Sequence, residues 1–194
     1  AIAHGSTGAG NDQVRFDGIF NIVCPQMEII TPIRDLKLSR EAEIEYLTNK
    51  GFSGDYTKSV YSINQGLWGT SVGGKETLTS HSNLPEEAYP SQLKKQIKEQ
   101  LTLEFEKGHL IKINDQKFSH PSEAIVKLNE IASEFAIGRD THVGDTIIGI
   151  KGRVGFEAAG AILTLKAHHL LEKHVLSKYQ LMIKSQMADW YGTW

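Results

Sequence analysis

The sequence predicts an α/β portion followed by an α+β region that ends in a long helix. Three observations predict this order. A short apolar run, a glycine-rich loop and the start of a helix follow one another over residues 1–16. Residues 101–106 alternate apolar and polar side chains before a turn and a second apolar run that ends at Ile113, and residues 161–191 contain neither glycine nor proline. These patterns are typical of a parallel strand-loop-helix unit, an antiparallel hairpin and a helix, respectively.

Composition limits the classes of protein to which the chain can belong. Its 194 residues are 40% apolar and 23% charged, which is globular composition and enough for one ordinary domain or for parts of two. The longest small-and-apolar run, residues 158–165, is far shorter than the roughly 20 residues of a membrane span. Twenty-one basic and 23 acidic side chains give a net charge of −2. We therefore expect neither a membrane nor a nucleic acid as a partner.

The first 50 residues predict the closing β-α-β-α portion of a parallel layer, in which ligands bind at the carboxyl ends of strands. The expected elements are, in order, a strand ending at His4, a tight loop over 5–10, a short helix capped by Asn11 or Asp12, a strand over 28–33, and a helix from Ser39 to Gly51. Residues 51–100 are rich in Gly, Ser, Thr and Asn and predict mostly loop.

The second half carries stronger periodic signals. The expected elements are, in order, a hairpin over 101–113 that turns at Lys107-Gly108, a helix opened by Pro121 and closed by Gly138, a strand over 146–150, and one long helix, or two with a bend, over 160–192. The apolar stripe of the last helix and the aromatic residues 190–194 need a covering surface.

Three features of the chain concern its context. Cys24 is the single cysteine and lies in an apolar stretch, so we expect a buried, inert thiol and a reducing compartment. The chain has no initiator Met and opens inside a strand-like segment. We therefore expect a fragment of a longer protein.

The loop over residues 5–10 is the densest candidate site. Successive backbone N–H groups in a glycine turn before a helix can form a cradle for phosphate or carboxylate. Its spacing matches neither the dinucleotide-binding nor the Walker loop, and a merely structural turn stays an equal alternative. Thr7, Asn11, Asp12 and Arg15 add polar groups that could hold both ends of an amino acid. An Asp12–Arg15 pair on the helix surface is the simpler alternative.

The segment His4–Phe16, HGSTGAGNDQVRF, resembles the corresponding loop of argininosuccinate synthases, H-G-x-T-x-x-G-N-D-x-x-R-F. The resemblance covers essentially the whole chain in order. It continues through residues 29–34, 61–64, 67–71, 136–140, 148–153 and 167–168.

The resemblance implies an enzyme of arginine biosynthesis that joins L-citrulline and L-aspartate. ATP activates the citrulline ureido oxygen as a citrullyl-adenylate with release of pyrophosphate, and the aspartate amine then displaces AMP. The cofactor implied is ATP with Mg²⁺ on the nucleotide and no protein-bound metal, in a cytoplasmic homotetramer. Residues 1–52 would end a Rossmann-like adenine nucleotide-binding domain, and residues 53–194 would form an incomplete synthetase domain.

The resemblance also implies roles for individual residues. Thr7, Asn11 and Asp12 would bind aspartate, and Asp12 would be the catalytic group that holds and deprotonates the attacking amine. Gly5, Ser6 and Thr7 would border ATP. The residues that would bind citrulline are Asn11, Arg15, Ser62 and Ser71.

Departures from the family pattern concern mainly citrulline. Ala9 stands where the family often has Lys. Gly144 aligns with a citrulline-binding Glu, so Asp145 is the expected substitute, and Phe156 replaces a citrulline-binding Tyr.

The pyrophosphatase motif Ser-Gly-Gly-x-Asp-Thr-Ser does not occur in these residues. We therefore expect the isolated chain to be inactive. The alternative is a non-catalytic, truncated synthase-like protein that binds an amino acid or a partner. The histidines His168, His169 and His174 lack zinc-site spacing and predict packing or surface roles.

Overall fold

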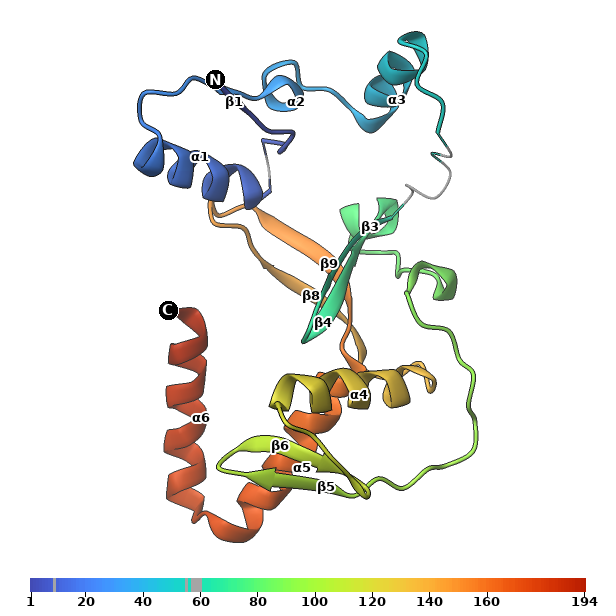
Figure 1. The fold of residues 1–194 in the computed structure, drawn as a ribbon, viewed down its shortest axis with the longest axis vertical. Coiled ribbons are helices and arrows are strands. Elements are labelled where there is room, and N and C mark those ends of the chain that lie inside the picture. The colour runs from blue at the N-terminus through green and yellow to red at the C-terminus, as the bar shows by residue number, and fades with distance from the viewer. Residues whose placement is uncertain (9, 55, 57–60) are drawn as a thin grey trace. The chain divides into compact units, whose positions relative to one another are not determined.

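The computed structural model describes residues 1–8, 10–54, 56 and 61–194 (Figure 1). The chain divides into two compact units. Unit 1 contains residues 1–62, 73–83 and 141–154, and unit 2 contains residues 63–72, 84–140 and 155–194. No helix in the described ranges combines the length and apolarity that crossing a membrane requires.

Unit 1 begins with the predicted parallel strand pair. Strand β1 (Ile2–Ala3) pairs in parallel with β2 (Ile29–Ile30), and helix α1 (Asp12–Val23) lies between them in the chain. The α1 helix is longer than the short helix expected from Val14 and Phe16. It runs to the residue before Cys24, whose exposure is intermediate, so the expected burial of this thiol is not observed.

Two further helices follow β2. The strand predicted over 28–33 stops at Ile30 because Pro32, which has no backbone N–H for a strand ladder, opens the short helix α2 (Pro32–Asp35). Helix α3 (Arg40–Asn49) is capped as predicted, since Ser39 Oγ accepts a hydrogen bond from the Ala42 N–H at 3.3 Å. Gly51, at φ +83°, ends it.

A four-stranded sheet has the order β3-β4-β9-β8, and the boundary between the two units falls within its strands. Its strands are β3 (Ser62–Gly66), β4 (Gly69–Gly73), β8 (Arg139–Asp145) and β9 (Lys151–Glu157). The prediction of mostly loop over 51–100 is therefore wrong for β3 and β4. Their Gly, Ser and Asn residues have weak strand propensity, and strand pairing overrides it.

The strand predicted over 146–150 is also wrong. This segment is the connection between β8 and β9, closed by hydrogen bonds from Thr146 N to Ile150 O and from Gly149 N to Thr146 O, both 2.8 Å. Its β-branched residues suggested a strand, but Gly149 adopts φ +82°, which suits a turn.

Unit 2 contains the main apolar core. The predicted hairpin is confirmed as β5 (Leu103–Glu106) and β6 (His109–Ile113), with positive φ at both turn residues, Lys107 (+49°) and Gly108 (+83°). Strand β7 (Gln116–Lys117) pairs with β6. The fully buried core residues between this sheet and helix α4 (Pro121–Ser133) are Leu110, Ile113, Ala124 and Leu128.

The helices of unit 2 differ in length from their predictions. Helix α4 begins at Pro121 as expected but ends at Ser133, before Ala136 and Gly138, which both adopt positive φ. The single-turn helices η2 (Lys75–Leu78, in unit 1) and η3 (Glu86–Ala88, in unit 2) lie in the chain between β4 and β5.

Of the two alternatives expected over 160–192, one long helix or two with a bend, the structure has the second: α5 (Ala159–Val175) and α6 (Lys178–Thr193). Leu176 is extended, at φ −98° and ψ 141°. Ser177 starts a new helix through a capping box, in which Gln180 Oε1 accepts from Ser177 N at 2.8 Å. The chain therefore bends where a capping signal competes with helix continuation.

Helix α6 is largely exposed. Trp190 is 62% exposed and Trp194 is 97% exposed. The covering surface expected for these aromatic residues stays a prediction.

Candidate functional site

The glycine loop joins the carboxyl end of β1 to the amino end of α1, which is where an anion meets both backbone N–H groups and the helix dipole. Gly5, Thr7 and Gly8 are exposed and Ser6 is half-buried. The substitution of Ala9 for the family's Lys lies outside the described residues. The loop can therefore offer a hydroxyl and backbone groups to a ligand from solvent.

Gln13 of α1 donates a hydrogen bond to this loop and was not among the site residues expected from the sequence. Its side chain is buried, and its Nε2 donates to the carbonyl oxygen of Gly8 at 3.1 Å. Among the described residues its Oε1 has no hydrogen-bond partner, and it faces Gly10. The family pattern leaves residue 13 unspecified, so the motif carried no signal for this glutamine.

His4, Asp17 and Arg34 form a hydrogen-bonded cluster that contacts the loop at Ser6. His4 Nε2 lies 2.9 Å from Asp17 Oδ1, and Arg34 Nη1 donates to Asp17 Oδ2 at 2.6 Å. The hydrogen bond from Arg34, followed by that from His4, lowers the pKa of the Asp17 carboxyl below its ordinary value. Because His4 Nδ1 accepts the N–H of Ser6 at 3.3 Å, this N–H is directed to the imidazole and not to solvent.

Asn11 occupies the predicted N-cap position of α1, but its side chain makes no cap hydrogen bond. Its Oδ1 instead accepts from the backbone N–H of Ile147 at 2.7 Å. Residue 11 is thus held by a connection 136 positions away in the sequence. The prediction that Asn11 occupies the N-cap position of α1 is therefore confirmed, but its side chain does not make the capping hydrogen bond.

Asp12 and Arg15 form the surface pair that their spacing allows, with Arg15 Nη1 and Asp12 Oδ1 at 3.3 Å. Their side chains are 71% and 65% exposed, respectively. Such an exposed pair contributes little to stability and exchanges partners easily. Both groups are accessible to a zwitterionic ligand.

Ser62 and Asp145 also belong to unit 1. Ser62 is exposed at the start of β3. Asp145, at the end of β8, forms an ion pair with Lys151 at 2.7 Å. As arranged, the Asp145 carboxylate is neutralised by Lys151.

Ser71 and Phe156 belong to unit 2, where they are directly opposed in the antiparallel pair of β4 and β9. The Phe156 ring packs over Gly69, where an added Cβ would lie 2.6 Å from the ring. The structure thus brings together two of the expected citrulline residues, and the ring has an apolar packing role of its own.

Among the described residues, no group of three or more His, Cys, Asp or Glu side chains could hold a metal ion. The Nδ1 atoms of His168 and His169 lie 3.0 and 3.3 Å from the carboxylate of Glu172. His168 also packs edge-on against Phe105. These contacts are the packing and surface roles that the spacing predicts.

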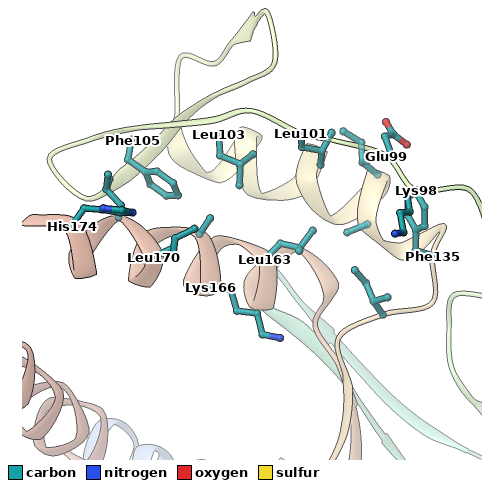
Figure 2. A pocket seen from close by; sticks show the side chains of 15 residues that line it. Lys98, Glu99, Leu101, Leu103, Phe105, Phe135, Leu163, Lys166, Leu170 and His174 are labelled. Carbon is teal, nitrogen blue, oxygen red and sulfur yellow. The ribbon is translucent and has the colours of Figure 1, made fainter.

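A cavity of about 810 Å³ lies in unit 2 between β5, α4 and α5. Figure 2 shows Leu101, Leu103 and Phe105 on one side of it and residues of α5 on the other. None of the expected site residues lines this cavity, and its walls are mainly apolar. We interpret it as a groove beside the core.

The fold and the loop define an α/β protein with an amino acid- or phosphate-binding type of turn at the end of a parallel strand. Comparison with known families agrees with this class. Residues 1–53 match the model described as Arginosuccinate synthase N-terminal HUP domain, and residues 61–194 match the Arginosuccinate synthase C-terminal domain. The chain belongs to the argininosuccinate synthase family.

Individual relatives support the same assignment. The chain is 41% identical to the argininosuccinate synthase of Methanocaldococcus jannaschii, over 99% of its own length and 49% of the relative's. It is 38% identical to the argininosuccinate synthase of Metallosphaera sedula, over 96% of this chain and 48% of the relative. It is 37% identical to the argininosuccinate synthase of Bacillus subtilis, over 100% of this chain and 51% of the relative. The chain spans about half the length of the curated relatives it matches.

Proposed function

We propose that this chain carries the aspartate site and part of the citrulline site of an argininosuccinate synthase. The whole protein would join L-citrulline and L-aspartate at the expense of ATP. In it, residues 1–52 would end the adenine nucleotide-binding domain and residues 53–194 would belong to the synthetase domain. We further propose that the complete enzyme is a cytoplasmic homotetramer.

The observation that carries the proposal is the exposed group of Thr7, Asp12 and Arg15 around the glycine loop. An amino acid has one ammonium and at least one carboxylate group. The carboxylate of Asp12 suits the ammonium of aspartate, and the Thr7 hydroxyl and nearby backbone N–H groups suit its carboxylates. Family membership supports this assignment.

Asp12 is the group we propose as catalytic. Its exposed carboxylate can hold the aspartate amine and accept a proton from it, and Arg15 at 3.3 Å can orient the carboxylate. Because no covalent nucleophile is needed, orientation of the amine is the main contribution of these residues.

The loop also suits a phosphate-bearing ligand. Gly5, Ser6 and Thr7 lie at the carboxyl end of β1, before the positive end of the α1 dipole, so their backbone could border ATP. ATP, bound with Mg²⁺, would supply activation of the citrulline ureido oxygen as a leaving group. The N–H of Ser6 is already donated to His4, so Ser6 would contribute through its hydroxyl or carbonyl oxygen.

For citrulline we propose Asn11, Arg15, Ser62 and Ser71, with Asp145 and Phe156 in the places of the family's Glu and Tyr. Phe156 has no hydroxyl, and Lys151 neutralises Asp145 at 2.7 Å. These two departures favour the second candidate, a synthase-like protein that binds an amino acid without catalysis.

Calorimetric titration of the chain with L-aspartate tests the proposal. We expect saturable binding that Asp12→Ala weakens about 10- to 100-fold, the worth of a charge-assisted hydrogen bond. Glu45→Ala removes an exposed carboxylate from α3 in the same unit and serves as the control. Equal affinity in the wild type and Asp12→Ala, or no aspartate binding at all, would contradict the proposed site.

A second measurement separates the two candidates. Citrulline that binds with aspartate supports the synthase site, and aspartate binding without citrulline binding favours the non-catalytic relative. AMP release from citrulline, aspartate and ATP is expected to stay at background for this chain alone. Turnover near that of a complete synthase would contradict this expectation.

A further inference from the structure

The imidazole of His4 connects the end of β1 to the glycine loop. Its side chain is only 7% exposed, and the ring centroids of Phe16 and Phe20 lie 5.4 and 6.2 Å from the centroid of its imidazole. A polar ring in such surroundings needs partners for both nitrogens, because water cannot readily provide them.

Both nitrogens have partners, and one partner determines the tautomer. The backbone N–H of Ser6 can only donate, so His4 Nδ1, 3.3 Å away, must carry a lone pair. The proton of the neutral ring is therefore on Nε2, which donates to Asp17 Oδ1 at 2.9 Å. Neutral His4 in the Nε2–H form satisfies every group in this chain of contacts.

The charges around His4 favour the same arrangement. Asp17 of α1 is the carboxylate that faces the ring, and Arg34 of α2 neutralises it from the other side at 2.6 Å. In strand β2, the carbonyl oxygen of Ile30 accepts a hydrogen bond from His4 N at 3.1 Å. The other charged groups near the start of α1, Asp12 and Arg15, pair with each other at the surface.

We propose that His4 is a positioning residue for the loop: its neutral Nε2–H form holds the Ser6 N–H and thereby orients Thr7 for its ligand. Protonation of Nδ1 would set two donors against each other and release the Ser6 backbone. The ligand part of this inference rests on the proposed function. The loop then binds an amino acid more weakly when His4 is charged.

Two amide substitutions separate the two hydrogen bonds of His4. In His4→Asn the side-chain Oδ1 lies near the place of Nδ1 and can accept from Ser6, but the side chain is too short for Asp17. In His4→Gln the Nε2 can donate to Asp17, but no acceptor remains beside Ser6. Both variants lose the ring, so lost ring packing affects both.

We expect His4→Asn to bind L-aspartate within about threefold of the wild type and His4→Gln to bind it at least about fivefold more weakly, as for one lost hydrogen bond. Thermal unfolding followed by circular dichroism checks that both variants fold. Equal affinities in the two variants, or weaker binding by His4→Asn, would overturn the positioning role, and so would failure of both variants to fold.

A spectroscopic readout does not depend on aspartate binding. In ¹⁵N-labelled wild-type chain, we expect an unprotonated Nδ1 and a protonated Nε2 in neutral His4. A Nδ1–H tautomer would overturn the inference. Wild-type chain that shows the tautomer but no aspartate binding would refute the proposed function and the ligand part of this inference, but not the tautomer.

Discussion

Gly160 lies where helix α5 packs against Asn129 of α4, and its replacement by alanine provides a sharp test of this packing. A Cβ at this position would lie 2.8 Å from the Asn129 backbone N and 2.9 Å from Asn129 Cα and Cβ. Two of these atoms are backbone, so no rotation of a side chain relieves the overlap. Any separation of the helices also stretches the hydrogen bond from Gly160 N to Asn129 Oδ1, now 3.1 Å.

The competing effect is small. Alanine is favoured over glycine by about 1 kcal/mol inside a helix, and by less at the second residue of α5. Overpacking costs about 1–3 kcal/mol, and a weakened hydrogen bond adds about 1 kcal/mol. We therefore expect Gly160→Ala to lower the free energy of unfolding by about 1–3 kcal/mol, and its Tm by about 2–10 °C.

Circular dichroism during urea and thermal unfolding measures this loss. Gly192→Ala is the control, because Gly192 lies in α6 of the same unit with no atom within 4 Å of an added Cβ. We expect a change between zero and a gain of about 1 kcal/mol for this control. A Gly160→Ala chain as stable as the wild type would refute the argument from close helix approach.

Two further predictions concern charged groups in unit 2. Arg139→Ala should destabilise the chain by about 3–5 kcal/mol, because it leaves Glu157, only 8% exposed, without the Arg139 Nε that donates to it at 2.9 Å. Urea unfolding measures this loss of stability. The double variant Arg139→Leu with Glu157→Leu should recover part of it, because no buried charge is then left without a partner. A loss below about 1 kcal/mol in Arg139→Ala would contradict the prediction. Glu172 accepts hydrogen bonds from Lys184 of α6, and this contact lowers the pKa of its carboxyl below the ordinary 4.5. The contact therefore stabilises the α5–α6 pair above about pH 4.5 and is lost as the pH falls through the lowered pKa. Hydrogen exchange of α6 amides should show this acid-side loss in the wild type and not in Glu172→Gln, and the same pH dependence in both would count against it.

Elements with strong local signals were predicted from the sequence. The Lys107-Gly108 turn, the proline start of α4 and the Ser39 cap of α3 each depend on the conformational preferences of a few adjacent residues. The motif from His4 to Phe16 identified the family for the same reason, since its residues are contiguous. Position along the chain alone places Thr7 in the glycine loop and Asn11 and Asp12 at the start of the helix that follows it.

Strand pairing and the polar contacts behind the loop could not be predicted in this way. Strands β3 and β4 have little strand propensity of their own; β3 pairs with β4, and β4 pairs with β9, more than 80 positions away. The bonds from His4 to Asp17 and from Ile147 to Asn11 join residues 13 and 136 positions apart. Contacts of this kind leave no periodicity in the sequence, because each depends on the distance between two particular atoms.

The sequence by itself determined the family, the candidate loop and most local elements, because backbone preferences, capping and turn chemistry act over a few neighbouring residues. The tertiary structure decided which partners those residues have: Asn11 bonds Ile147 instead of capping α1, and Gln13 and His4 hold the loop. A buried polar group must find its partner in space, wherever that partner lies in the chain.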